Sequence, residues 1–189
     1  MISAIAPIGM TADACLALLQ NSTIEEHGEL MAAMTDPMNA LISFQQALAT
    51  GGVSPQMAEL HNDVLVLFDH PNGVPRFTYA LVREQSVVAV AVFVPTDPID
   101  GTTCFNSGYA VDQRHRSKGL GKEITQKAFD ELTEGFRRAG FPGLYVEAIV
   151  STSNEHSQRL ANRLFSDSPT ACTDEESGQP ALQYVRRLF

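Results

Sequence analysis

The segment of residues 113–122 contains the residue types and spacing best suited to chemistry. It reads Gln-Arg-His-Arg-Ser-Lys-Gly-Leu-Gly-Lys and holds four of the thirteen Lys and Arg residues of a protein with a formal net charge of -9. An aromatic and β-branched run typical of a strand precedes it at 105–111, and apolar residues at helical spacing follow from Leu120 onward. The segment therefore predicts a cationic, glycine-containing loop between a strand and a helix.

A loop of this kind is suited to bind an anion. The first N–H groups of a helix have no intrahelical partner, and the helix dipole adds partial positive charge at that end. Gly119 and Gly121 allow a ligand to approach the backbone without a Cβ in the way. Cationic side chains surround the glycines, at Arg114, Arg116, Lys118 and Lys122. The pattern predicts a binding site for a phosphate or pyrophosphate group.

Two common phosphate-binding loops do not fit this segment. A Walker A loop requires Ser or Thr after its Gly-Lys pair, whereas Lys122 is followed by Glu123, which would repel a phosphate. The dinucleotide-binding fingerprint would begin at Gly119, but its third glycine position holds Ile124. The sequence therefore excludes both of these loop types.

The glycine spacing resembles instead the Arg/Gln-x-x-Gly-x-Gly/Ala loop of the GNAT superfamily of acyl-CoA N-acyltransferases. In that family the backbone amides of the loop hold the pyrophosphate of coenzyme A. The resemblance implies that acetyl-CoA, or a close acyl-CoA, is the co-substrate, and that no metal is needed. It implies coenzyme contacts from seven consecutive residues, Arg116, Ser117, Lys118, Gly119, Leu120, Gly121 and Lys122.

Residues 109–112 resemble the end of the family's fourth strand, which stops in a bulge. The resemblance implies that the backbone of Ala110 and Val111 meets the thioester. A free N–H near Val111 would then donate to the oxygen that becomes the oxyanion.

Residues 154–165 resemble the family's Asn-x-x-Ala-x-x-Leu-Tyr helix, which implies that Asn154 and Ser157 lie close to the coenzyme. Asn154 also has the residue type of a helix N-cap. The chain departs from the family at Ala161, where a Tyr often protonates the departing thiolate. That acid is not carried over, and the tyrosines that could replace it are Tyr109, Tyr145 and Tyr184.

Two carboxylates are candidates for the general base. An alkylamine has a pKa of about 10.4, so a base must remove a proton before the amine attacks a thioester. Glu147 is the one ionisable residue in the apolar segment 144–150, where burial would raise its pKa, although it could also be an outward-facing or ion-paired residue. Asp112 lies beside the loop and could serve as the base, or could hydrogen-bond Arg114 or turn amides.

The surrounding pattern fits an α/β (α+β) fold with a mixed, mostly antiparallel central sheet flanked by helices, as the resemblance implies. We expect one domain over 1–189, with a helix-rich part at 1–75 on the acceptor side and an acyl-CoA-binding core at 76–189. Strands are predicted at 2–7, 64–68, 77–82, 87–94, 105–111, 144–150, 171–172 and 181–188, with a hairpin connection at 95–101. Helices are predicted at 25–35 and 37–50, and from Thr11, Ser54, Leu120 and Asn154 onward.

Composition limits the partners. Eight of the 22 acidic residues and none of the cationic residues lie in 1–75, and an acidic chain disfavours nucleic acid. No apolar run approaches the roughly 20 residues of a membrane span, and no signal-peptide cations are present. We therefore expect a cytoplasmic protein without membrane contact. The cysteines are widely spaced, which favours buried thiols over a disulfide or zinc site: Cys15, Cys104 and Cys172.

These observations predict an enzyme that binds acyl-CoA and an amine acceptor. It would transfer an acetyl or short acyl group to a primary amine of a small molecule or protein. Direct attack in a ternary complex is favoured, because no Cys stands next to a suitable base in the recognised segments. The alternative is a catalytically silent module of the same fold that senses acyl-CoA, which Ala161 favours. The acceptor's identity stays open, and a homodimer is one assembly that the sequence allows.

Overall fold

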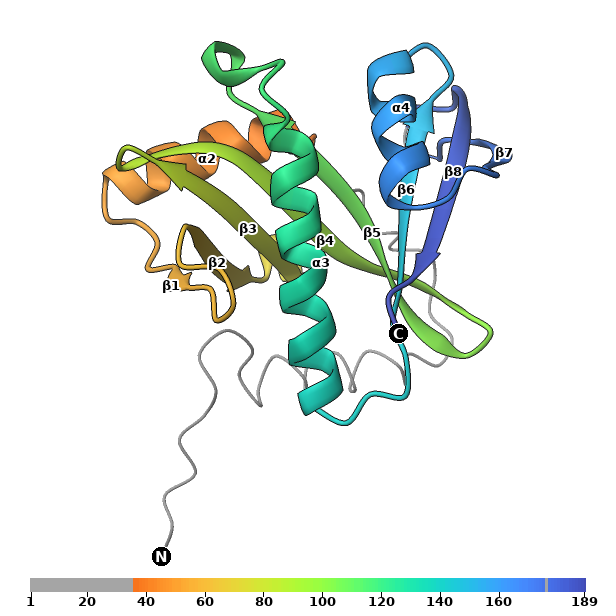
Figure 1. The fold of residues 1–189 in the computed structure, drawn as a ribbon, viewed down its shortest axis with the longest axis horizontal. Helices are drawn as coiled ribbons and strands as arrows, with labels where there is room; N and C mark the ends of the chain where they lie inside the picture. The colour runs from red at the N-terminus through yellow and green to blue at the C-terminus, as the bar shows by residue number, and fades with distance from the viewer. Residues whose placement is uncertain (1–35, 176) are drawn as a thin grey trace, which may run out of the picture.

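Eight strands and three α-helices make up the described part of the chain, residues 36–175 and 177–189 of the computed structural model (Figure 1). The strands are β1 (Gln56–Met57), β2 (Val64–Asp69), β3 (Arg76–Arg83), β4 (Ser86–Ile99), β5 (Thr102–Val111), β6 (Tyr145–Ser151), β7 (Thr170–Thr173) and β8 (Pro180–Arg187). The helices are α2 (Pro37–Ala49), α3 (Leu120–Arg138) and α4 (Glu155–Leu164), with 3-10 turns η1 (Pro71–Gly73) and η2 (Gln113–His115). The strand predicted at 2–7 and the helices predicted from Thr11 and at 25–35 lie outside the described residues.

All strands belong to one sheet, in the order β1-β2-β3-β4-β5-β6-β8-β7. Neighbouring strands run antiparallel, with the exception of β5 and β6, which are parallel. The predicted α/β fold with a mixed, mostly antiparallel sheet is confirmed. The helices predicted at 37–50 and from Leu120 and Asn154 onward are also confirmed.

Helices cover both faces of the sheet (Figure 1). On one face α2 packs through Leu41 and Phe44 on residues of β3 to β5 such as Val90. On the other face α3 packs through Ile124, Leu132 and Phe136 on side chains of β3 to β6. Because both faces of its central part are covered, β4 is buried without interruption from 87 to 94, which explains its continuous apolar sequence.

The helix predicted to begin at Ser54 is wrong. Instead, Gln56 pairs with Val66 and Met57 with Leu65, and the chain forms the edge strand β1. A Ser-Pro pair is ambiguous, because the φ that Pro fixes suits an extended chain as well as a helix start. At a sheet edge the missing N–H of Pro costs no ladder hydrogen bond.

The connection predicted at 95–101 is shorter than expected. β4 continues to Ile99, and Asp100 and Gly101 form the turn with φ values of 49° and 71°. Asp-Gly is favoured in a two-residue hairpin turn because both positions require positive φ. This hairpin leads directly into β5, which carries the candidate site.

Candidate active site where β5 and β6 diverge

The parallel pairing of β5 with β6 is short and ends in the middle of both strands. It consists of three pairs, Cys104↔Tyr145, Phe105↔Val146 and Asn106↔Glu147. Beyond them β5 continues to Val111 and β6 to Ser151, and the two strands separate (Figure 1). The backbone of β5 beyond Asn106 therefore has one side that β6 does not occupy.

The N–H groups of Tyr109 and Val111 point toward this divergence. The backbone N–H of Asp112 donates to Val88 O at 2.9 Å, which makes these two residues a hydrogen-bonded pair of the β4–β5 ladder. Hydrogen-bonded and non-hydrogen-bonded pairs alternate along an antiparallel ladder. The backbone N–H of Ala110 therefore bonds to β4, whereas the backbone N–H groups of Tyr109 and Val111 point away from β4. Sequence reasoning named Val111 but missed the N–H of Tyr109.

The bulge predicted at the end of β5 is absent from its pairing with β4. That register is regular from Phe105 to Val111, and its one shift lies between Thr96 and Ile99. The separation of β6, rather than a bulge, leaves the N–H groups of β5 unpaired on that side.

Asp112 begins the loop as a capping residue. Its Oδ1 accepts hydrogen bonds from the backbone N of Arg114 at 2.9 Å and from Arg114 Nε at 3.2 Å. These bonds hold the pKa of Asp112 well below its usual range. A carboxylate stabilised in this way is a weak base, so the geometry favours the structural alternative for Asp112.

The loop then turns through two residues with left-handed backbone conformation. Ser117 has a φ of 61°, and Gly119, the N-cap of α3, has a φ of 77°. The N-cap has no side-chain hydrogen bond to the first turn of α3. A Cβ built on Gly119 would meet no described atom within 4 Å. The start of α3 thus combines uncapped N–H groups with open space, as an anion site requires.

Gly121 has a different role from the one predicted for it. A Cβ at this position would lie 2.7 Å from Cε2 and 2.9 Å from Cδ2 of Tyr109. Gly121 therefore lets the ring of Tyr109 pack against the first turn of α3, rather than opening the backbone to a ligand.

The start of α4 also contacts Tyr109. Asn154 caps α4, with its Oδ1 accepting from Ser157 N at 3.1 Å. The hydroxyl oxygens of Ser157 and Tyr109 are 3.3 Å apart. Tyr109 consequently connects the beginnings of α3 and α4, and it brings Asn154 and Ser157 to the same end of the sheet as the loop.

The cationic side chains of the loop remain accessible. Arg116, Lys118 and Lys122 are exposed, and Arg116 Nε contacts Val111 O at 3.4 Å. Glu123 would oppose an anion, but its carboxylate is paired with Lys127 Nζ at 2.9 Å and with Arg83. Its charge is therefore compensated by contacts that the loop does not supply.

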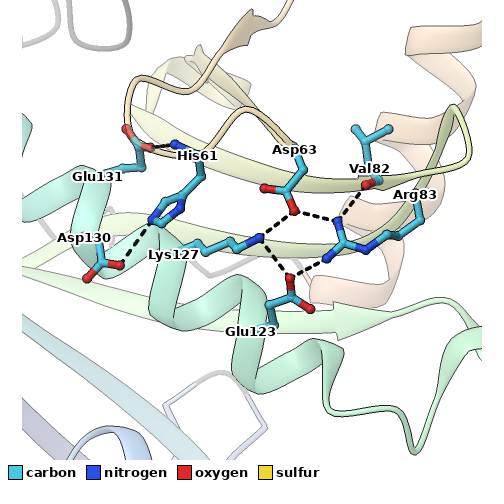
Figure 2. A network of polar contacts seen from close by, with 8 residues as sticks. All are labelled: His61, Asp63, Val82, Arg83, Glu123, Lys127, Asp130 and Glu131. Atoms are coloured by element: carbon cyan, nitrogen blue, oxygen red, sulfur yellow. Dashed lines mark hydrogen bonds and ion pairs between the residues drawn. The ribbon is translucent and has the colours of Figure 1, made fainter.

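These contacts belong to a network that joins α3 to β3 and to the chain before β2 (Figure 2). Asp63 Oδ2 lies 2.5 Å from Lys127 Nζ and 2.6 Å from Arg83 Nη1. Burial opposes ionisation of Asp63 and Glu123, but hydrogen bonds from Lys127 and Arg83 outweigh it and lower both pKa values. Sequence reasoning missed the network, since only Glu123 and Lys127 stand at helical spacing.

Glu147 lies on the face of β6 opposite α3 and α4. Its neighbours Val146 and Ala148 pack on the side of these helices, so the alternation of a strand turns Glu147 the other way. The side chain is 7% exposed, and Oε2 accepts a hydrogen bond from Gln183 Nε2 at 2.7 Å. Its neighbour Asn106 is six positions, about 20 Å of extended chain, from Asp112, so the two candidate bases do not lie together.

A family model described as the Acetyltransferase (GNAT) family matches residues 42–165 of the sequence. The chain belongs to the GNAT acetyltransferase family. The match includes β5, β6, the cationic loop and α4. No curated protein sequence significantly matches the chain.

Several solved acetyltransferase structures are similar to this GNAT-family chain at low identity. One from Streptococcus pneumoniae is 10% identical with a TM-score of 0.46, over 81% of this chain and 95% of its own. One from Salmonella typhimurium, which modifies the N-terminal serine of a ribosomal protein, is 18% identical with a TM-score of 0.45, over 62% and 66%. A spermidine/spermine N-acetyltransferase from Vibrio cholerae is 13% identical with a TM-score of 0.42, over 63% and 69%.

In this GNAT-family chain, Ala161 occupies the position of the family's tyrosine and forms part of the hydrophobic core. Ala161 is 4% exposed and packs with Ala148, Val150 and Tyr184, which is itself 1% exposed. Ser157 precedes Ala161 by four residues and shares its face of α4. Of the three alternative tyrosines, Tyr109 is the one whose hydroxyl has a recorded hydrogen-bond contact with this face, at Ser157.

Two further findings concern the described residues 36–175 and 177–189. They contain no group of three or more His, Cys, Asp and Glu placed to hold a metal ion. None of their helices is both long and apolar enough to cross a membrane.

Proposed function

We propose that this GNAT-family protein transfers an acetyl or other short acyl group from acyl-CoA to a primary amine of a small molecule or protein. The observation that carries the proposal is the uncapped start of α3 beside the divergence of β5 and β6. The first N–H groups of α3 would bind the pyrophosphate, with help from Arg116, Lys118 and Lys122. Asn154 and Ser157 would contact the coenzyme from α4.

The divergence of the strands supports a position for the pantetheine arm. The arm would run along β5 from the loop toward Asn106, within reach of the N–H groups of Val111 and Tyr109. One of these groups would donate to the thioester carbonyl as negative charge develops on its oxygen. Tyr109 N–H lies three residues, about 10 Å of strand, from Asn106, so it is closer than Val111 to the pair Asn106 and Glu147.

Glu147 would accept the proton of the amine, directly or through water. Its burial and its hydrogen bond to Gln183 support this role, and the capping contacts of Asp112 weigh against that residue. The departing thiolate needs a proton, and Tyr109 is the candidate donor because its hydroxyl reaches Ser157 on the face of α4 that carries Ala161.

Direct attack is favoured over an acyl-enzyme intermediate. Cys104 is 1% exposed, and burial, with a contribution from the charge of Glu147, raises the pKa of its thiol to about 12. The thiol is therefore protonated at neutral pH and is a poor nucleophile.

A catalytically silent acyl-CoA sensor is the second candidate function. The replacement of the family's Tyr by Ala161, buried in the core, is the observation that favours it. Acetyl-CoA binding without thiol release on any amine would support the sensor and contradict the enzyme.

Calorimetric titration with acetyl-CoA, followed by thiol release on a panel of amines, tests the proposal. We expect Arg116→Glu to weaken acetyl-CoA binding about tenfold, since one charge-assisted contact is replaced by repulsion. Arg163→Glu, a charge reversal at an exposed position of α4, is the matched control and should leave the affinity unchanged. Equal affinities of the two variants would contradict pyrophosphate binding at the loop.

A further inference from the structure

Two hydrogen-bond acceptors lie side by side where β5 leaves β6. Asn106 and Glu147 are the last register pair of the two strands. Neighbouring strands lie about 4.8 Å apart, and paired residues direct their side chains to the same face. Phe105 packs on the α3 side, so Asn106, like Glu147, points to the opposite face.

Neither acceptor is fully satisfied by the described residues. Asn106 Oδ1 is inaccessible to solvent and has no hydrogen-bond partner among residues 36–175 and 177–189. Within the same residues, the one side-chain donor to Glu147 is Gln183, at Oε2, and none of the ion pairs includes Glu147. A buried amide oxygen without a donor, beside a buried carboxylate whose one side-chain donor is uncharged, is unfavourable unless a ligand supplies further donors.

The surroundings of the pair identify the kind of ligand. Cys104, on the same face of β5, is a buried neutral thiol, and Gln183 is uncharged. α2 packs against β4 and β5, whereas the described contacts of α4 with β6 and β8 lie on the other face. Half-buried side chains, including Ile149 and Gln183, border the pair on this side. The pair therefore favours a compact group that brings at least two N–H donors and can carry positive charge.

We propose that Asn106 is a specificity-determining residue for the acceptor, and that its Oδ1 and the carboxylate of Glu147 each accept one N–H of the incoming primary amine. This inference rests on the proposed function. It adds a residue that no motif of the sequence singles out, and it gives the site a chemical basis for preferring primary to secondary amines.

The reaction at this pair balances without a further reactant. The ammonium gives one proton to Glu147, and the nitrogen lone pair then forms the C–N bond to the thioester carbon. The C–S bond breaks, and coenzyme A leaves as the thiol with a proton from Tyr109; the second proton lost by the nitrogen restores the Tyr109 hydroxyl. The products are the amide, free coenzyme A and the proton that Glu147 returns to water.

The test compares n-butylamine with N-methylbutylamine as acceptors from acetyl-CoA, by thiol release, in the full chain and in Asn106→Leu. Leu has the same number and branching of side-chain heavy atoms as Asn, with a somewhat larger volume and no acceptor, so steric exclusion of the methyl group is retained. We expect kcat/KM for n-butylamine to fall about tenfold, because one N–H of the amine then lacks a partner. N-Methylbutylamine has a single N–H once its ammonium form has given a proton to Glu147, so its attacking form can use Glu147 alone, and the fall should be less than about threefold.

A second measurement does not need turnover. n-Butylammonium should raise the melting temperature of the wild-type protein more than 1-butanol does, and this difference should become smaller in Asn106→Leu, where Glu147 alone accepts from the ammonium. Asn162→Leu, at an exposed position of α4, is the matched control for both measurements.

The outcomes separate the two proposals. Equal losses on both amines, or none, together with an unchanged ammonium effect on melting, would overturn the role of Asn106 while the proposed function stands. Failure of the wild-type protein to bind acetyl-CoA would overturn the proposed function. The melting comparison would still decide whether Asn106 takes part in binding an ammonium group.

Discussion

At the scale of single residues, Glu147 is the group whose environment is least explained by folding. It is a carboxylate with 7% exposure, and among the described residues the side chain that donates a hydrogen bond to it is Gln183. A buried charge without a cation is costly, and such groups concentrate at functional sites. Asp112 shows the opposite situation, because its contacts with Arg114 account for it as a cap.

Glu147→Gln should lower kcat/KM for the best acceptor amine about 100-fold near pH 7, because a general base is removed. The amide can still accept the hydrogen bond of Gln183, so the fold and the acetyl-CoA affinity should be unchanged. The deficit should shrink as the pH approaches about 10, where the amine loses its proton to water. Steady-state kinetics from pH 7 to 10, with the exposed Glu84→Gln as control, measure this. A deficit that stays constant with pH would argue against a base.

Tyr109→Phe tests the proton donor for the thiolate. Phe keeps the ring that packs against Gly121 and removes the hydroxyl that contacts Ser157. We expect kcat to fall about tenfold or more, with acetyl-CoA affinity and melting temperature nearly unchanged. Ser157→Ala serves as the comparison, since it removes the same contact but leaves the Tyr109 hydroxyl. Equal effects of both variants would indicate that the contact, rather than the proton, matters.

At the scale of elements, the site depends on how closely β5 approaches the start of α3. This approach requires glycine at 121, where the Tyr109 ring would be 2.7 Å from a Cβ. Gly119 is required for another reason, since its φ of 77° is disfavoured for other residues. Two glycines separated by one residue thus serve packing and backbone conformation respectively.

Gly121→Ala should destabilise the protein by about 1–3 kcal/mol, because the Tyr109 ring or the first turn of α3 must move. Combining it with Tyr109→Ala should cost less than the sum of the two changes, since the clash disappears. Urea denaturation of the wild type, both single variants and the double variant gives the coupling energy. Strict additivity would show that the ring and the glycine do not interact.

At the scale of the whole molecule, the network of Asp63, Arg83, Glu123 and Lys127 fixes α3 to the sheet (Figure 2). The pKa values of both carboxyls are lowered in the folded protein. The contribution of the two carboxylates to the free energy of unfolding is therefore present above the pKa of a carboxyl in the unfolded chain, about 4. It is lost as the pH falls through the lower pKa values of the folded protein. The network should stabilise the protein at neutral pH but not in strong acid.

Lys127→Met should lower the stability at pH 7 by about 1 kcal/mol. The difference from the wild type should shrink below about pH 4 as Asp63 and Glu123 become protonated. Thermal unfolding from pH 2 to 7 measures this, with Lys122→Met, at an exposed position, as the control. A difference that does not depend on pH would mean that Lys127 acts through packing of its alkyl chain instead.

Much of the fold and part of the site could be predicted because they depend on local patterns. The apolar spacing after Leu120 and the Asn154 cap have local causes, and both helices are where they were expected. The prediction of a helix beginning at Ser54 failed because a Ser-Pro pair suits both a helix start and an extended chain. Pairing with β2 selected the extended conformation. Asn106 could not be found, since its unpaired oxygen results from the register of β5 with β6.

The sequence by itself determined the strand–loop–helix unit around Gly119, the charge that surrounds it and the family to which the chain belongs. These properties depend on neighbouring residues, whose conformational preferences act over a few positions. Only the tertiary structure decided that Gly121 packs on Tyr109, that Asp112 and Glu147 lie far apart, and that Asn106 stands beside Glu147. These relations join segments distant along the chain, and the place where two strands separate depends on packing across the whole sheet.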